Sequence, residues 1–211
     1  MSKRNIMKGI LGKKVGMTSI FLDNGMQIAC TVIEAGPCTV TQVKTGETDG
    51  YDAIQIAFGE RKEKNTSKGL KNHLAKAGTS PKRIIKELRN ASLDKQVGDV
   101  ITCDIFERGD EVEVVGTSKG KGFQGVVKRH GFHGVGESTH GQHDRSRAPG
   151  SIGASSDPSR VFKGMRMGGR MGGDRVKVKG LSVVRVYPEE NLILVSGSVP
   201  GHNGSIVLIQ N

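Results

Sequence analysis

The stretch that decides the fold class is SIFLDNGMQIACTVIE, residues 19–34. Apolar and polar side chains alternate on both sides of Asn24–Gly25, and a period of two is typical of a strand with one buried face. Asn-Gly is the dipeptide most typical of a tight hairpin turn, because both residues tolerate a positive φ. The stretch therefore predicts two antiparallel strands joined by a turn.

Further short segments of this kind lie on both sides of a glycine-rich region. Turn signals at residues 188–191 and 200–201 separate the last three of them. Many short strands with few long helices favour a mainly β fold, an antiparallel barrel or sandwich. The expected strands are Thr39–Lys44, Ala53–Phe58, Val100–Ile105, Glu111–Val115, Val176–Val178, Ser182–Tyr187, Leu192–Ser196 and Ser205–Ile209.

Residues 60–90 have a different amino-acid composition, which is rich in Lys and compatible with a helix. Ser67 is the expected N-cap of a helix over Lys68–Ala77, which Gly78 would end. Arg83–Leu88 fits either a turn of helix or an edge strand. We expect a small α+β subdomain here.

Residues 117–180 follow neither the helical period nor the strand period. They contain 15 glycines in 64 residues and too few apolar groups to offset the entropy of ordering this chain alone. Because strand-like segments flank the region, it is an internal extension of a β core, and it stays mobile unless a partner orders it. The sequence therefore predicts a barrel core of residues 1–59, 91–116 and 176–211, an inserted subdomain of residues 60–90, and an extension of residues 117–175.

Positive charge indicates the class of partner. The formal net charge is +11, which favours a polyanion, either nucleic acid or an anionic membrane. Residues 117–180 carry 13 Lys and Arg against 4 Asp and Glu, a net charge of +9, so +2 remains for the rest of the chain. A membrane protein needs an apolar run of about 18 residues or a cationic helix with an apolar face, and Lys and Gly interrupt every candidate. Nucleic acid is the favoured partner.

The expected compartment is the cytoplasm. Lys8 and Gly9 divide the N-terminal segment, which therefore lacks the apolar centre of a secretory signal. Cys30, Cys38 and Cys103 are odd in number, form no CxxC pair and lie in apolar, strand-like surroundings. We expect buried thiols in a reducing compartment.

Residues 120–125, GKGFQG, match the G-x-G-x-x-G pattern of dinucleotide-binding loops, and Asp144 has about the spacing of the ribose contact. That site needs a helix that begins at the glycines. We expect none, because KRHG and further glycines follow at residues 128–131. Glycines beside Lys119 and Lys121 would instead let backbone amides approach phosphates closely.

Two HxxH spacings, His130/His133 and His140/His143, could supply four imidazoles to zinc. No Cys and no helix accompanies them, and the neighbouring Arg and Lys would repel a metal ion. The cluster also offers no Ser/His/Asp or Cys/His arrangement for a hydrolase. We expect no metal, no cofactor and no catalytic residue, and favour histidines that bind phosphate or stack on bases.

Residues 164–175, GMRMGGRMGGDR, nearly repeat Arg-Met-Gly-Gly. The alternative is a flexible solvated linker, which gains little from a guanidinium at every fourth or fifth position. RNA uses such groups for bidentate phosphate contacts and for stacking on exposed bases. RNA contact is the favoured interpretation.

Four segments in order along the chain resemble the bacterial type of the large-subunit ribosomal protein L3 (uL3) family. They are KGILGKKVGMT at 8–18, GTSKGKGFQGVVKR at 116–129, PGSIGASSDPSRVFKG at 149–164 and Leu192–Gly201. The resemblance covers essentially the whole chain. It implies a translation-protein-type antiparallel β-barrel with an α+β insert, and an extension threaded through ribosomal RNA towards the peptidyl transferase centre. It also implies a role in early subunit assembly, contacts with neighbouring ribosomal proteins, no enzymatic activity, no membrane or small-molecule substrate, and a place in cytoplasmic ribosomes.

The expected site residues are cations and imidazoles of the N-terminal segment and the extension. Those expected to bind RNA are Lys8, Lys13, Lys14, Lys119, Lys121, Lys128, Arg129, His130, His133, His140, His143, Arg145, Arg147, Arg160, Lys163, Arg166, Arg170 and Arg175. By the resemblance, the tip nearest the peptidyl transferase centre consists of Arg147, Pro149, Gly150, Ser151, Ile152, Gly153, Ala154 and Ser155.

Two positions depart from the family pattern. Glu113 stands where Asp or Asn is expected, and Ala154 stands where some bacterial members carry an N-methylated glutamine, so that modification is not expected. Two other functional classes are alternatives: an RNA chaperone or regulatory RNA-binding protein outside the ribosome, and a metal-dependent nuclease. Co-sedimentation with large subunits at high salt distinguishes a ribosomal protein from the first alternative. Metal analysis tests the second alternative, the nuclease.

Overall fold

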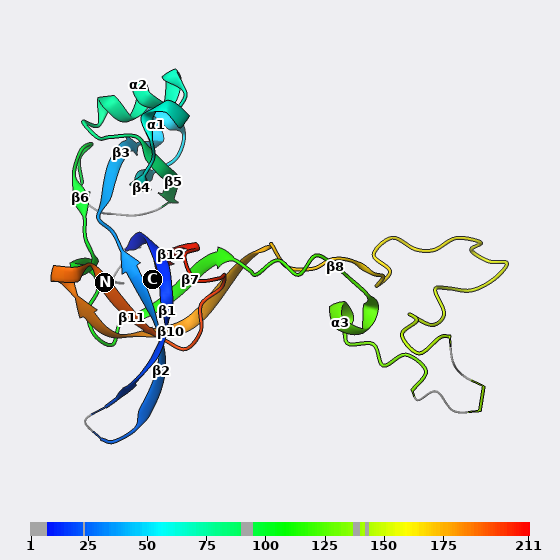
Figure 1. Cartoon of the computed structure of the whole chain (residues 1–211). Helices are drawn as coiled ribbons and strands as arrows, with labels where there is room; N and C mark the ends of the chain where they lie inside the picture. Colours follow the sequence, from blue (N-terminus) through cyan, green and yellow to red (C-terminus); the bar gives the residue numbers. More distant parts are fainter. Residues whose placement is uncertain (1–7, 23, 90–94, 137–139, 142–143) are drawn as a thin grey trace, which may run out of the picture. The chain divides into compact units, whose positions relative to one another are not determined.

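The computed structural model describes residues 8–22, 24–89, 95–136, 140–141 and 144–211. The chain divides into two compact units, the first running to Thr117 and resuming at Arg175, and the second comprising Ser118–Asp174 (Figure 1). We call the first the barrel unit and the second the extension. The extension expected from the sequence, residues 117–175, is one residue longer at each end.

Six strands of the barrel unit form a closed antiparallel barrel in the order β1-β12-β7-β10-β11-β2. They are β1 (Gly9–Phe21), β2 (Gln27–Ala35), β7 (Glu111–Thr117), β10 (Arg175–Tyr187), β11 (Leu192–Ser196) and β12 (Ile206–Gln210). Figure 1 shows β1, in blue, beside β12, in red. The prediction of a mainly β fold built on an antiparallel barrel is confirmed.

The hairpin predicted at residues 19–34 is present. Phe21 of β1 lies opposite Gln27 of β2, and the backbone N–H of Leu22 donates to the carbonyl of Met26 at 2.9 Å. Gly25 has a φ of 77°, in the left-handed region that glycine tolerates without a steric penalty. The turn residues thus fix the register of the first two strands.

Branched apolar side chains fill the barrel. Ile10 of β1 lies opposite Ile209 of β12, and Ile209 lies opposite Val114 of β7. All three are fully buried, as expected for one face of strands that alternate. The last pair of the β7–β10 ladder is Thr117 with Arg175. The chain therefore leaves the barrel unit and returns to it at two paired residues.

A second, four-stranded sheet of the barrel unit has the order β5-β4-β3-β6. Its strands are β3 (Cys38–Lys44), β4 (Ala53–Glu60), β5 (Lys82–Arg89) and β6 (Val100–Ile101). Strand β3, and β4 except for its last residue, Glu60, lie within residues 1–59, which the sequence assigned to the barrel core. Alternation identifies a strand, but the partner in its ladder depends on contacts distant in sequence. The ambiguous segment Arg83–Leu88 is a strand, and the expected strand Val100–Ile105 stops at Ile101.

Short helices accompany this sheet. Helix α2 begins at the predicted N-cap, Ser67, although the Ser67 side chain makes no capping hydrogen bond. Leu74 is the buried residue of this helix, and the His73 ring lies 2.6 Å from the side-chain oxygen of Gln55 on β4. The helical segments of the barrel unit are α1 (Gly46–Asp49), α2 (Lys68–Lys76) and the 3-10 turns Glu63–Asn65, Cys103–Ile105 and Pro188–Glu190.

The three cysteines, Cys30, Cys38 and Cys103, are buried free thiols, as the sequence predicted. Burial raises the pKa of Cys38 to about 12, so this thiol stays protonated at neutral pH and is a poor nucleophile. Its side chain packs in the main apolar core with Ile10 and Ile56.

Candidate nucleic-acid interface

The extension begins as two hydrogen-bonded segments of chain. We call residues 118–124 the outgoing limb and residues 166–174 the returning limb. The backbone N–H of Ser118 donates to the carbonyl of Asp174 at 2.8 Å, and that of Lys121 donates to the carbonyl of Met171 at 2.9 Å. Two short antiparallel strands continue this pairing towards the middle of the segment. The regular elements of the extension are β8 (Phe123–Gln124), α3 (Val126–His130) and β9 (Gly169–Arg170).

Glycine is required where the limbs and loops touch. Gly172 has a φ of 73°, and a Cβ there would overlap the carbonyl oxygen of Lys119. Gly134 has a φ of 72°, and a Cβ there would overlap the carbonyl oxygen of Ser146. At both positions the backbone of one segment packs directly on the backbone of another, which only glycine allows.

A short helix, α3, follows the glycine motif at residues 120–125. The expectation that no helix begins there is wrong, because Gly125 is the N-cap of α3 and Gly131 ends it with a φ of 72°. The dinucleotide site is excluded for a different reason. That site belongs to a parallel βαβ unit, whereas all strand pairs among the described residues are antiparallel.

Two side chains of α3 bind the returning limb. Arg129 donates from Nη1 to the carbonyl of Met167 at 2.8 Å, and Nε2 of His130 lies 3.1 Å from the same oxygen. Val126 is 4% exposed and is the one buried side chain among the described residues of the extension. Polar contacts, with almost no apolar core, hold the segment together.

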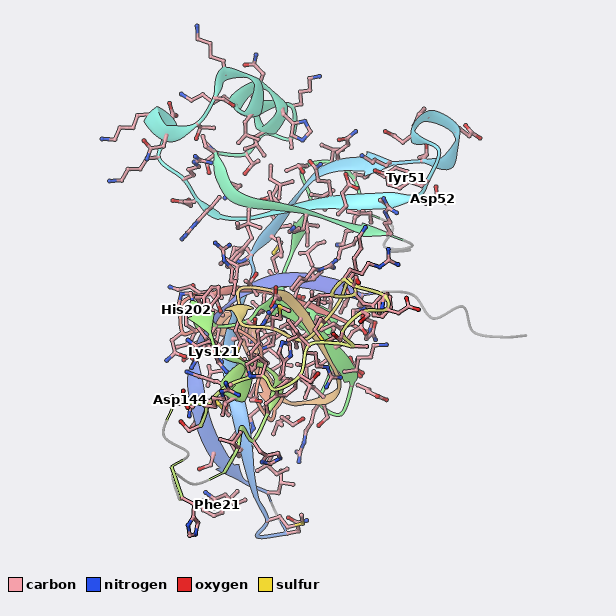
Figure 2. The ribbon with its side chains drawn as sticks, turned by 90° about the vertical axis from the view of Figure 1, so that its right-hand side faces the viewer. Phe21, Tyr51, Asp52, Lys121, Asp144 and His202 are labelled. Atoms are coloured by element: carbon pink, nitrogen blue, oxygen red, sulfur yellow. The ribbon has the colours of Figure 1, made fainter. Side chains whose placement is uncertain are left out.

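The cations of the extension are not paired with any carboxylate among the described residues. In the part of the chain that the structure describes, none of them forms an ion pair with a carboxylate, whereas pairs such as Lys44–Glu87, at 2.9 Å, occur in the barrel unit. Figure 2 draws these side chains and labels Lys121 and Asp144 of the extension. The cations are Lys119, Lys121, Lys128, Arg129, Arg145, Arg147, Arg160, Lys163, Arg166 and Arg170. Their charge is available for an external anion.

Known proteins match this chain along nearly its whole length. Residues 84–190 match the family model described as ribosomal protein L3. The large ribosomal subunit protein uL3 of Salinibacter ruber is 56% identical over 200 residues, covering 94% of this chain and 96% of the relative. The protein of the same name from Chlorobium phaeobacteroides is 58% identical over 205 residues, covering 96% and 98%. The chain belongs to the ribosomal protein L3 family.

The L3 family match includes the unusual part of the molecule. Residues 84–190 contain the whole of the extension, Ser118–Asp174, together with β7 and β10, which flank it in the sequence. The resemblance that the sequence segments predicted, including the bacterial type, is confirmed by these matches. The extension is therefore a feature of the family and not an insertion peculiar to this chain.

One predicted RNA-binding residue of this L3 chain needs correction. The side chain of Lys14 is buried, 6% exposed, and its ammonium donates to the carbonyl oxygens of Val199 and Gly201 at 2.9 and 3.1 Å. The backbone of the barrel unit thus binds a cation that we expected to bind phosphate. The neighbouring Lys13 points outward, with its side chain 51% exposed and its ammonium 3.9 Å from Glu34.

The other predicted site residues lie in several places. Three of them, His130, His133 and Arg166, line one hollow of the extension. Every residue of the predicted tip, from Arg147 to Ser155, is exposed except Ala148, which is half-buried. Arg175 is exposed at the start of β10. His143 lies outside the described residues.

The described residues contain neither a metal-binding cluster nor a membrane-spanning helix. Among them, no group of three or more His, Cys, Asp or Glu side chains is placed to hold a metal ion. No helix in the same part of the chain has the length and apolar character needed to cross a membrane.

Exposed phenylalanines of the extension were missing from the predicted site. Phe123 is 80% exposed and Phe162 is 57% exposed, and the guanidinium carbon of Arg160 lies 5.6 Å from the centre of the Phe162 ring. Exposed aromatic rings among cations are typical of surfaces on which bases stack. The signal was present in the sequence as Phe residues within the Lys-, Arg- and Gly-rich region.

Proposed function

We propose that this chain is a non-catalytic structural component of the large ribosomal subunit in the cytoplasm, and that it binds ribosomal RNA directly through the extension. The observation that carries the proposal is made on the described residues of the extension, which include ten cations without a carboxylate partner and one buried side chain. Neutralising phosphates supplies the free energy that such a segment lacks for its own ordering. The names of the uL3 relatives support the ribosomal setting.

The two units have different tasks in this proposal. The barrel unit is a rigid anchor, and its paired residues Thr117 and Arg175 set where the extension begins. Phosphate contacts fix the position of a protein on RNA without reading its sequence, so the extension can hold RNA helices together as the subunit begins to assemble. Neighbouring ribosomal proteins would contact the remaining surface of the barrel unit.

The exposed tip has a further role in the proposal. Residues 147–155 carry one cation, Arg147, and small or apolar side chains that present little steric bulk. By the family resemblance this tip supports RNA near the peptidyl transferase centre. The RNA performs the chemistry, and the tip limits how far that RNA can shift.

A charge-matched pair of variants tests direct RNA binding. The first variant replaces Lys119, Lys121, Lys128 and Arg170 with Gln, and its control replaces the exposed Lys62, Lys64, Lys68 and Lys76 of the barrel unit with Gln. Both lose the same formal charge. After large subunits are washed at high salt, the extension variant should be depleted from them and the control retained like wild type. Equal retention of the two variants would contradict the proposal.

Deletion of His140–Ser156 tests the role of the tip. The barrel unit should stay folded, and the subunit should retain the protein because the cations of the two limbs remain. Peptide-bond formation or antibiotic binding at the peptidyl transferase centre should change in purified subunits that contain the variant at full occupancy. Wild-type values for both would show that the tip has no such role.

A further inference from the structure

The extension contains a hollow of about 470 Å³. Its walls come from three separate segments: residues 130–135, which begin with the last residue of α3, residues 148–150, and Arg166 on the returning limb. Sites for small organic groups in proteins typically occupy about 300 to 1,000 Å³. The hollow is thus large enough for one nucleotide, and the phosphate-binding role proposed above does not account for it.

The lining has the chemistry of a base-binding site. It combines the phenyl ring of Phe132 and the imidazoles of His130 and His133 with apolar Val135 and Pro149. Flat rings of this kind stack on unpaired bases in RNA-binding proteins. Arg166 is the one guanidinium in the wall, and no carboxylate lines the hollow among the described residues.

Contacts outside the hollow hold its shape. The His130 ring is fixed by its contact with the carbonyl of Met167 at 3.1 Å, and its centre lies 6.0 Å from that of Phe132, with the ring planes tilted by 46°. Gly134 packs against the backbone of Ser146, which keeps residues 148–150 close to residues 133–135. These contacts all lie within the extension, and they give the rings their positions in the hollow.

We propose that this hollow binds a single unstacked base of the RNA, with the base against Phe132 and the adjoining phosphate on Arg166. The inference rests on the proposed function, since it assumes that the extension meets RNA. It adds that the extension recognises an unpaired nucleotide, in a loop or bulge, in addition to the phosphates of paired helices. A paired base keeps both faces in its stack and cannot enter a concave site.

The test uses the full-length protein, the large-subunit ribosomal RNA and the variant Phe132→Leu, which keeps apolar bulk and removes the ring. At one salt concentration its affinity should fall about tenfold to a hundredfold, the usual effect of losing one stacked base. The dependence of affinity on salt should not change, because no cation is lost. The control is Phe21→Leu, which removes a ring that is 68% exposed, more exposed than the half-buried Phe132, near the tip of the β1–β2 hairpin (Figure 2), and should bind like wild type.

A second variant and a direct probe separate stacking from charge. Arg166→Gln should lower the slope of log affinity against log salt by about one unit. In methylation of the bound RNA by dimethyl sulfate, an unpaired base protected by the wild-type protein should become reactive with Phe132→Leu, while the rest of the footprint remains. Wild-type affinity and an unchanged footprint for Phe132→Leu would overturn the base-binding inference alone. Failure of the wild-type protein to bind the RNA would overturn the proposed function together with it.

Discussion

The ammonium of Lys14 donates a hydrogen bond of 2.9 Å to the backbone carbonyl oxygen of Val199, 185 positions away in the sequence. The same ammonium reaches the carbonyl of Gly201 at 3.1 Å. These contacts join β1 to the segment that leads into β12. They make Lys14 part of the anchor, although it stands in the sequence beside Lys13, whose side chain is exposed.

Replacement of Lys14 by Met should destabilise the free protein by about 2 to 4 kcal/mol, because it removes two charge-assisted hydrogen bonds and leaves buried carbonyl groups without a donor. Lys13→Met should cost less than about 1 kcal/mol, since the ion pair it loses is exposed. Urea unfolding of both variants measures the difference. Equal stabilities for the two variants would show that the buried ammonium contributes nothing to the anchor.

Glu113 should make the stability of the barrel unit depend on pH. The ammonium of Lys177 donates to its carboxylate, which holds the pKa of Glu113 below its ordinary value, and Gln210 donates to the same oxygen. A lowered folded-state pKa contributes stability that is complete above the unfolded-state pKa and is lost as pH falls through the folded-state pKa. This glutamate, an unexpected residue in the family pattern, thus joins β7, β10 and β12.

We expect Glu113→Gln to lose less unfolding free energy than wild type as the pH falls from about 5 to about 3. Urea unfolding at a series of pH values gives the comparison. Glu111→Gln, at an exposed position of the same strand, is the control and should keep the wild-type dependence. Identical pH profiles for wild type and Glu113→Gln would argue against the proposed effect of the Lys177 contact.

Trypsin should cut the free protein first at Arg145, Arg147, Arg160 and Lys163. These residues are exposed and lie between β8 and β9, away from the hydrogen-bonded limbs, in a segment without an apolar core. Lys119 and Lys121 should be cut more slowly, and ribosomal RNA should protect all of these sites. Mass spectrometry of early fragments gives the order of cleavage. Slow amide exchange through residues 144–166 of the free protein would contradict the expectation.

The barrel could be predicted from the sequence better than the pairing of its strands. Alternation and the Asn24–Gly25 turn are local signals, so they located the first hairpin correctly. Strands β3 and β4 have the same alternation but pair in the second sheet, and no local signal identifies that partner. The period of two also places Lys14 on the inward face with Ile10, yet a lysine is rarely assigned to a core.

The hollow beside Phe132 could not be predicted from the sequence for a similar reason. Its three segments are brought together by backbone turns at Gly131 and Gly134 and by the contacts of α3 with Met167. None of these follows a strand or helix period. The cations, in contrast, could be predicted because charge segregation is visible in the sequence itself.

We propose that the extension provides most of the RNA affinity and that the barrel unit is its anchor. Since Thr117 and Arg175 are paired in the β7–β10 ladder, Ser118–Asp174 can be replaced by an Asn-Gly turn that closes a hairpin. The urea midpoint of this variant should stay close to that of wild type, which shows that the barrel unit is folded.

The decisive measurement is the affinity of wild type and of this variant for large-subunit ribosomal RNA as a function of salt. With about six to ten phosphates neutralised, wild-type affinity should fall by about three to five decades between about 50 and 200 mM salt. The variant should bind weakly throughout and lose less than about one decade. A folded variant that retains the affinity and salt dependence of wild type would contradict the account.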